Sequence, residues 1–309
     1  MKALQGTKLA PVIEAVRARA VERRRVVPLA ELRRRVEAAR RAHGSSGARS
    51  ETEGVTERAA SVPITAQDRE ADAQHVLTPR ARFLARFGKD ELALICELKR
   101  RSPSAGPLLA DDGPRPGARY LALAEAYARA GAAALSVLTE RDHFDGALDD
   151  LASVAHLGVP RLRKDFLLDE YMLLESAAHG AEAVLLIAAL LDDAELRDLR
   201  QLAKELDLAV LLEVHDEQEL ERALPIAPDL LGVNARDLRT LVTDLATVER
   251  LLPRIPNTTV RVAESGLKTA DDLLRVRRAG ADAVLVGETL VRSNDPLRTL
   301  LDWKAALHG

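Results

Sequence analysis

Apolar positions follow two different rhythms along the chain. Beyond residue 90, short runs of Val, Leu, Ile and Ala alternate with stretches in which apolar residues recur every three or four positions. The first rhythm is typical of strands buried on both faces and the second of amphipathic helices. Their alternation predicts βα units and a parallel sheet. The runs expected as strands are 92–96, 133–138, 161–163, 183–187, 208–214, 230–233, 260–263 and 283–286.

The number of units distinguishes two α/β architectures. Eight strand–helix units predict a (β/α)8 TIM barrel over residues 77–309, close to the roughly 250 residues that this fold typically needs. The related segments GAAALSV, GAEAVLLI and GADAVLVG each begin with a glycine suited to end a helix before a strand. An open doubly wound sheet usually has fewer strands and a glycine-rich first turn, which LKRRSPSAG is not.

Residues 1–42 predict a basic amphipathic extension of two helices. Apolar residues recur at helical spacing, and Pro28 opens the second segment. Twelve Lys or Arg against four Glu give this part a charge of +8. Because the whole chain is acidic, we expect solvated faces of helices that cap the barrel and not an RNA or membrane contact. The apolar positions are Val12, Ile13, Val16, Ala20, Leu29, Leu32, Val36 and Ala39.

Residues 43–76 are rich in Gly, Ser, Thr, Ala and charge and contain no aromatic residue. Such a segment buries too little apolar surface to offset its ordering entropy. We therefore expect a flexible low-complexity insert, followed by a short helix in TPRARFLARF near Thr78 that begins the barrel domain.

Composition narrows the class of protein. With 47% hydrophobic and 30% charged residues the chain suits a globular enzyme, and its net charge of -3 gives no reason to expect nucleic acid or an anionic membrane. The longest apolar run, 183–191, is too short to span a bilayer, and the charged N-terminus lacks the apolar segment of a signal peptide. The lone Cys96 reads as a small buried hydrophobe. These features predict a cytoplasmic protein.

The sequence predicts neither a metal nor a cofactor. The seven histidines show no HExxH or Cys/His ligand spacing, and no GxGxxG motif is present. His215, which follows Glu213 closely, is expected as a loop or cap residue.

Polar residues that end the apolar runs are the candidates for chemistry, because active sites of TIM barrels lie at the C-terminal ends of the strands. Glu213 interrupts LAVLLEV, so it must find partners or accept a raised pKa. Lys164 is either a general acid or half of an ion pair with Asp165 or Glu97. The candidates are Glu97, Lys99, Lys164, Glu213, Asn234, Glu264 and Ser265.

Two glycine turns suggest a phosphate site. ESG at 264–266 and VGET at 286–289 each precede a helical pattern, in the loops after the seventh and eighth strands. Backbone N–H groups at such turns bind phosphate, and these two loops are its usual location in this fold.

These segments also resemble the motifs of one family over nearly all of residues 91–298. In order along the chain, they are ICELKRRSPSAG, ALSVLTERDHFDG, LRKDFLLDEY, LLEVHDEQEL, GVNARDLRTL, VAESGLKT and LVGETLVRSNDP. They are similar to those of indole-3-glycerol-phosphate synthases, and the basic N-terminus resembles that family's helical extension over the barrel mouth.

The resemblance implies a reaction and the residues that carry it. The family converts 1-(2-carboxyphenylamino)-1-deoxyribulose 5-phosphate to indole-3-glycerol phosphate in tryptophan biosynthesis, releasing carbon dioxide and water without a cofactor. By resemblance, Lys164 is the general acid of ring closure and Glu213 the general base of the dehydration. Glu97 and Lys99 match a charged pair beside the reacting centre, with Lys99 either a partner of the substrate carboxylate or the acid of the dehydration. Asn234 orders the catalytic groups.

The resemblance also implies binding residues. Arg236 and Glu264 match substrate contacts, and Phe144 and Phe166 resemble the walls that hold the anthranilate ring. The implied phosphate contacts are Ser102, Ser265, Gly266 and Gly287. The chain departs from many members at Ala105, Ala235 and Glu288, where Lys, Asn or Ser, and a small hydroxyl residue are common. A glutamate at 288 would repel phosphate if it pointed inward.

Two alternatives stay open at this stage. One is another ribulose-phosphate barrel, such as phosphoribosylanthranilate isomerase, which would need a Cys and Asp pair at strand ends. The other is a barrel that only binds a ligand. We expect a phosphorylated small molecule as partner and a monomer or weak homo-oligomer, with room for a tryptophan-pathway enzyme docked on the barrel.

Overall fold

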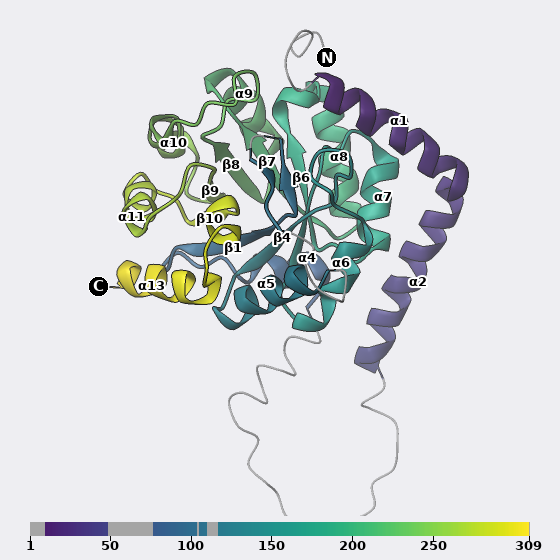
Figure 1. Cartoon of the computed structure of the whole chain (residues 1–309). Helices are drawn as coiled ribbons and strands as arrows, with labels where there is room; N and C mark the ends of the chain where they lie inside the picture. Colours follow the sequence, from purple (N-terminus) through teal and green to yellow (C-terminus); the bar gives the residue numbers. More distant parts are fainter. Residues whose placement is uncertain (1–9, 49–76, 104, 110–116, 309) are drawn as a thin grey trace, which may run out of the picture.

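The computed structural model describes residues 10–48, 77–103, 105–109 and 117–308. In this part of the chain, eight parallel strands close into a barrel in which each pairs with the next and the last pairs with the first (Figure 1). Every expected run forms one of these strands, so the (β/α)8 TIM barrel is confirmed. The strands are β1 (Ala93–Leu98), β4 (Ala134–Leu138), β5 (Arg161–Lys164), β6 (Ala183–Ile187), β7 (Ala209–Val214), β8 (Leu230–Asn234), β9 (Val260–Glu264) and β10 (Ala283–Val286).

Helices surround the barrel and bury its outer face. Several begin at an acidic or hydroxyl N-cap that accepts backbone hydrogen bonds, as Asp192 does from Ala194 and Glu195. The helices are α5 (Ala118–Arg129), α6 (Asp149–Ser153), α7 (Glu170–Ala178), α8 (Asp193–Glu205), α9 (Glu217–Ala223), α10 (Leu245–Leu251), α11 (Ala270–Arg278), α12 (Glu288–Val291) and α13 (Pro296–His308). Short 3₁₀ turns are η2 (Ala155–Leu157), η3 (Ala188–Leu190), η4 (Leu224–Ile226) and η5 (Leu252–Arg254).

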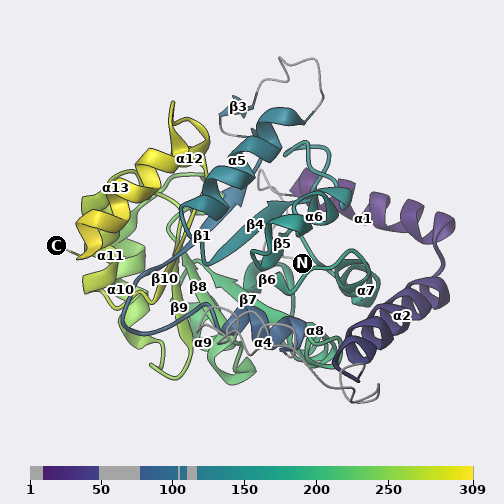
Figure 2. The ribbon, with the colours of Figure 1, turned by 90° about the horizontal axis from the view of Figure 1, so that it is seen from below.

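The short helix α4 (Pro79–Leu84) closes one end of the barrel. Thr78 caps it, and Phe83 is fully buried. Figure 2 shows α4 at the end opposite the small hairpin of β2 (Arg101–Ser102) and β3 (Gly106–Pro107), which follows the C-terminal end of β1. The C-terminal ends of the strands are therefore left for the functional site.

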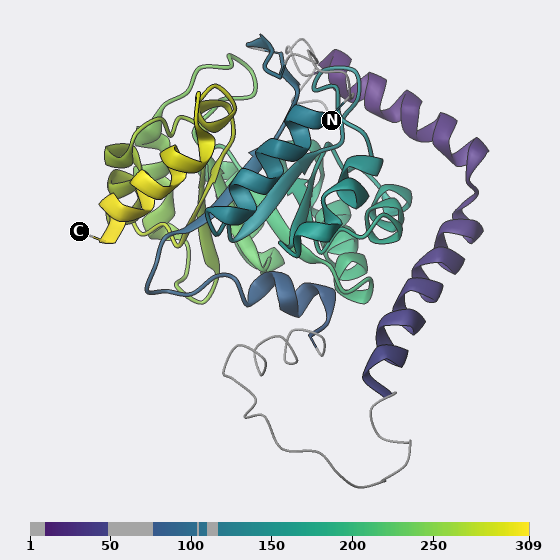
Figure 3. The same ribbon diagram turned by 60° about the horizontal axis from the view of Figure 1, so that its bottom comes forward.

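The two expected N-terminal helices are α1 (Ala10–Val26) and α2 (Leu29–Ala48). Val12 of α1 lines the main cavity, whereas α2 runs down the side of the barrel beside α7 (Figure 3). The expected insert began at residue 43, but α2 continues to Ala48, because each further residue adds a backbone hydrogen bond to a helix already formed, against the low helix propensity of Gly44 and Gly47. The rest of that insert, 49–76, lies outside the described residues.

The basic charge of α1 and α2 has partners. Arg residues on these helices pair with carboxylates of α7, of its N-cap and of the loop after β4. The basic face expected to be solvated is therefore partly paired with the barrel domain. No helix in the described ranges is long and apolar enough to cross a membrane. The pairs are Arg19–Asp142, Arg23–Glu175, Arg24–Asp169 and Arg33–Glu170.

Cys96 lies in β1 and is buried, as expected. Burial raises the pKa of its thiol to about 12, so the group stays neutral at physiological pH.

Candidate active site

One cavity of about 940 Å³ contains every residue that the sequence singled out for the site. Its wall is formed at the C-terminal ends of the strands and the loops that follow them, with Val12 of α1 at its edge. The structure thus brings together side chains from distant parts of the chain. These residues are Glu97, Lys99, Ser102, Phe144, Lys164, Phe166, Glu213, Asn234, Arg236, Glu264, Ser265, Gly266 and Gly287.

Lys164 forms the centre of the charged site. Its Nζ lies 3.0 Å from Glu213 Oε2 and 3.7 Å from Glu264 Oε2, across the barrel from the end of β5. Burial alone would lower the pKa of Lys164, but the carboxylates of Glu213, Glu264 and Glu97 outweigh it and raise the pKa. The ammonium therefore carries its proton at neutral pH.

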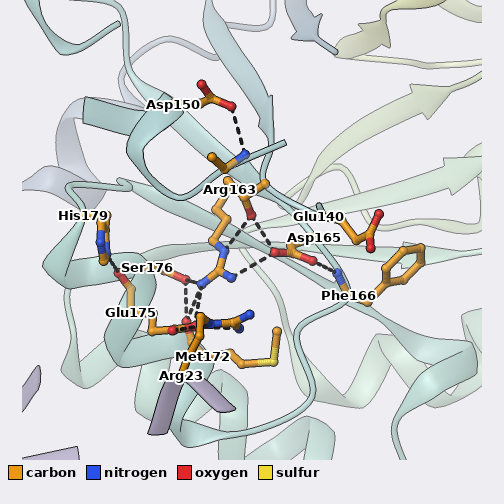
Figure 4. A network of polar contacts seen from close by, with 12 residues as sticks. Arg23, Glu140, Asp150, Arg163, Asp165, Phe166, Met172, Glu175, Ser176 and His179 are labelled. Carbon is orange, nitrogen blue, oxygen red and sulfur yellow. Dashed lines mark hydrogen bonds and ion pairs between the residues drawn. The ribbon is translucent and has the colours of Figure 1, made fainter. Parts of the chain in front are cut away.

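The alternative for Lys164 was an ion pair with Asp165 or Glu97, and the structure shows other partners for all three residues. Successive residues of a strand point to opposite faces, so Asp165 lies outside the barrel with Arg163, at 2.9 Å (Figure 4). Glu97 is paired with Lys99, whose Nζ lies 2.6 Å from Glu97 Oε1.

Glu213 finds partners and does not take the raised pKa that was the alternative. Asn234 Nδ2 donates to its Oε1 at 3.1 Å, while the Asn234 Oδ1 accepts from the Arg236 backbone N–H at 3.0 Å, which fixes the amide. Burial would raise the pKa of Glu213, but Lys164, His215 and Asn234 together lower it. Glu213 is therefore ionised at neutral pH.

Glu264 is the carboxyl group that burial perturbs. Within the described residues, neither of its buried oxygens has a hydrogen-bond partner. Burial and the charge of Glu213 raise the pKa of Glu264 to about 8. Its place depends on Gly232, because a Cβ there would overlap Glu264 Oε1.

Gly287 has a similar relation to Glu97. A Cβ at Gly287 would overlap the Glu97 carboxylate, so this glycine makes room for the Glu97–Lys99 pair in addition to lining the cavity. Its expected phosphate contact stays a prediction.

Phe144 and Phe166 face each other in the cavity wall. Their ring centroids are 6.3 Å apart at an angle of 48°. The buried Glu140 accepts hydrogen bonds from the backbone N–H groups of His143 and Phe144, which fixes the loop that carries Phe144. Sequence reasoning missed Glu140, although it follows the apolar run 133–138 in the way the chosen residues follow theirs.

The two expected phosphate loops adjoin each other. Ser265 and Gly266 have positive φ values of 66° and 77°, and Thr289 Oγ1 donates to the Leu267 carbonyl at 2.8 Å. Glu288 lies 3.1 Å from Arg292 in an ion pair, so its charge is compensated where the two side chains line the cavity.

His215 was expected as a loop or cap residue, and its position between β7 and α9 agrees. Its ring, however, is buried against two carboxylates: Nε2 lies 3.0 Å from Glu213 Oε1 and Nδ1 lies 2.9 Å from Glu219 Oε2. The signal was its spacing, because residues i and i+2 of an extended segment lie on the same side. Across the described ranges, no cluster of three or more His, Cys, Asp or Glu side chains is arranged to hold a metal.

A closed parallel barrel with acid and base side chains converging at the C-terminal ends of its strands defines a TIM-barrel enzyme. Solved structures agree on the fold. A 3-hexulose-6-phosphate synthase from Salmonella typhimurium has a TM-score of 0.56 at 14% identity, with coverage of 70% of this chain and 99% of that one. An orotidine 5'-phosphate decarboxylase from Pyrococcus horikoshii has a TM-score of 0.53 at 14% identity, with 70% and 99% coverage.

Sequence relatives identify the family. The model of the family described as indole-3-glycerol phosphate synthase matches residues 48–301. An indole-3-glycerol phosphate synthase from Streptomyces coelicolor is 48% identical over 70% of this chain and 79% of its own length. One from Albidiferax ferrireducens is 45% identical over 76% and 87%. The chain therefore belongs to the indole-3-glycerol phosphate synthase family, and its function is that of a carboxy-lyase of tryptophan biosynthesis. The isomerase and the ligand-binding barrel are set aside.

Proposed function

We propose that Lys164 is the general acid of ring closure and Glu213 the general base of the dehydration. The observation that carries this assignment is the 3.0 Å contact between Lys164 Nζ and Glu213 Oε2, in which each group holds the other in its charged form. An acid that keeps its proton and a base that stays ionised, side by side in one cavity, are the two groups that the reaction needs.

The steps follow from the substrate. Lys164 protonates the ribulose carbonyl oxygen as the ring carbon that bears the carboxylate attacks the carbonyl carbon. The carboxylate then leaves as carbon dioxide, and its bonding electrons restore the aromatic ring. Loss of the new hydroxyl group as water requires a proton on oxygen and removal of a proton from the carbon next to nitrogen. Glu213 removes that carbon proton.

Glu97 holds Lys99 at the wall of the cavity, and Lys99 has one of two roles. It binds the substrate carboxylate, or it gives the proton to the leaving hydroxyl group. A Lys99→Met variant separates them, because loss of ground-state binding appears in KM and loss of proton donation appears in kcat. Glu264 in its protonated form can donate a hydrogen bond to the ribulose chain, and Arg236 is assigned to the carboxylate end.

The phosphate is assigned to the loops that contain Ser102, Ser265, Gly266 and Gly287. The positive φ values at Ser265 and Gly266 and the position of both residues in the cavity wall support this assignment. Ser265→Asp should raise KM and weaken inhibition by inorganic phosphate, because a carboxylate repels the anion. Unchanged KM and phosphate inhibition would remove the assignment.

The partner that this proposal requires is the phosphorylated substrate alone. We propose that the enzyme works in a reducing cytoplasm, which its single buried thiol supports. A monomer or weak homo-oligomer, and a tryptophan-pathway enzyme docked on the barrel, stay predictions. So does the division into a helical extension, an insert and a barrel domain.

The direct test mixes the purified protein with 1-(2-carboxyphenylamino)-1-deoxyribulose 5-phosphate and follows indole fluorescence. We expect indole-3-glycerol phosphate and an equal amount of carbon dioxide. Carbon dioxide without indole fluorescence would mean that Glu213 does not complete the dehydration. The absence of both products would contradict the whole assignment.

A further inference from the structure

A second cavity, of about 710 Å³, lies behind the general base. Its wall comes from η3, α8, α9, η4 and the loop at residues 237–239. His215 and Glu219 both line it, together with Asp216 and the cations Arg197 and Arg239. The steps assigned to the main cavity use neither His215 nor Glu219.

Three side chains form a continuous path from the main cavity to the second one. Glu213 contacts Lys164 through Oε2 and His215 through Oε1, both at 3.0 Å, and His215 contacts Glu219 through Nδ1 at 2.9 Å. Exposure of the side chains rises outward along this path, from 2% for Glu213 to 8% for His215 and 16% for Glu219. The path thus leads from a buried group toward solvent.

His215 is protonated at neutral pH. Burial would lower its pKa, but Glu213 and Glu219 outweigh burial and raise the pKa to about 10. Among the described residues its Nε2 has no aligned hydrogen-bond acceptor, although Glu213 Oε1 is 3.0 Å away. The two atoms are thus within hydrogen-bond distance, and proton transfer between them needs the ring N–H to turn toward Glu213 Oε1.

The reaction requires such a proton from solvent. The substrate carboxylate leaves as neutral carbon dioxide, so each turnover consumes one proton when the phosphate is unchanged. Water formation uses two protons, and the carbon next to nitrogen supplies only one of them. Glu213 can return that one to Lys164 directly, which leaves the charged cluster one proton short. Substrate or product fills the main cavity while this happens.

We propose that His215 and Glu219 form a proton relay, through which the catalytic cluster takes up one proton per turnover from the second cavity. His215 gives its proton to Glu213, Glu213 passes it to the lysine that is left without one after the carbon proton has been returned, and solvent in the second cavity restores His215 through Glu219. This inference rests on the assignment of Glu213 as the general base. His215 is a relay residue and not a catalytic one, because it acts on Glu213 and not on the substrate.

A structural role is the alternative, because Glu219 also accepts a hydrogen bond from the His215 backbone N–H at 2.8 Å, at the start of α9. The variants must therefore keep the local fold. Glu219→Gln keeps an acceptor for that N–H and removes the charge, and His215→Gln keeps a polar side chain without a transferable proton. Circular dichroism and thermal unfolding check that both variants fold.

The experiment compares product formation with proton uptake in rapid mixing. A pH-indicator dye in weak buffer reports the proton before the released carbon dioxide hydrates, and absorbance reports the indole. In the wild type the two signals should rise together. In His215→Gln and Glu219→Gln the first turnover should keep its rate, proton uptake should lag behind, and steady-state kcat should fall about tenfold with little change in KM. Added imidazole should restore kcat of a His215→Ala variant.

The remaining outcomes contradict the relay. Equal slowing of the first turnover and the steady state, with no effect of imidazole, would make His215 a support for Glu213. Unchanged kcat and unchanged proton uptake in both variants would mean that the proton enters through the opening of the main cavity.

Two control variants, Gln218→Ala in the second cavity and His156→Gln on an exposed turn, should behave as wild type. Glu213→Gln tests the underlying assignment separately, since it should abolish indole formation even in the first turnover.

Discussion

Arg163 and Lys164 are consecutive residues of β5, yet their side chains enter two different environments. Arg163 points outward and is satisfied at every nitrogen in the layer between β5 and α7, with 1% of its side chain exposed (Figure 4). It donates to or pairs with Thr139, Asp165, Met172, Glu175 and Ser176.

Lys164 points inward, where the number of cations does not match the number of carboxyl groups. One ammonium faces Glu213 and Glu264, and the oxygens of Glu264 have no hydrogen-bond partner among the described residues. A satisfied polar network makes a fold specific, whereas an unsatisfied one costs stability unless a ligand completes it. The comparison therefore separates the polar network around Arg163, which stabilises the barrel, from the charged cluster around Lys164, which a bound substrate can complete.

The largest effect should come from breaking the inner cluster. Lys164→Ala should lower kcat by roughly 10²- to 10⁴-fold with a much smaller change in KM, because its proton is needed in the transition state. Steady-state kinetics and thermal unfolding are the measurements, and the fold should survive.

Lys164→Arg is the control that separates charge from acidity. It should restore little activity, because the planar guanidinium keeps the charge but cannot place a single N–H donor where the compact lysine ammonium lies. Near-normal kcat in Lys164→Ala, or a rise in KM alone, would make Lys164 a binding cation.

Breaking the outer network should instead unfold the protein more easily. Arg163→Met leaves the buried Asp165 without its cation, which typically costs about 3 to 5 kcal/mol, while Glu175 keeps Arg23 as a partner. Denaturant unfolding measures this loss. For the molecules that stay folded, kcat should change far less than in Lys164→Ala. A stable Arg163→Met protein with low kcat would mean that the outer network acts in catalysis.

These two environments also show which features of the site can be predicted from the sequence. Strand order and the converging residues followed from the apolar runs and from what ends them, so Lys164, Glu213 and Glu264 could be named together. Alternation along a strand is enough to separate Asp165 from Lys164 and to place His215 on the side of Glu213. The partner of Lys164 among Glu97, Glu213 and Glu264 could not be chosen in this way, because it depends on how the strands lie around the barrel. The ion-pair alternative for Lys164 named Asp165 or Glu97, and His215 was not connected to Glu213. The distribution of protons likewise depends on burial, which gives Glu264, and not Glu213, the raised pKa.

A pH effect should distinguish the inner cluster by its sign. The pKa of Glu264 is about 8 in the fold and near its ordinary 4.5 when unfolded. Its contribution to stability is fully present below pH 4.5 and is lost as pH rises toward about 8, with a slope on the order of 1 kcal/mol per pH unit. Unfolding of wild type and Glu264→Gln over this range measures it, and the variant should lack this loss. Parallel curves for Glu264→Gln and wild type would exclude a raised pKa.

The smallest effect should appear where the outer network reaches α1. Arg23 Nε lies 2.6 Å from Glu175 Oε1, so this helix is tied to Arg163 through one shared carboxylate. The Arg23 side chain is 34% exposed, and water can take over part of its role. Arg23→Met should therefore cost no more than about 1 kcal/mol, well below Arg163→Met, because Glu175 keeps Arg163 as a partner.

Arg24→Met is the matched control, since its pair with Asp169 is more exposed on both sides and should contribute almost nothing to stability. Both variants should keep kcat. A loss from Arg23→Met as large as that from Arg163→Met would show that Arg163 does not compensate for Arg23 at Glu175.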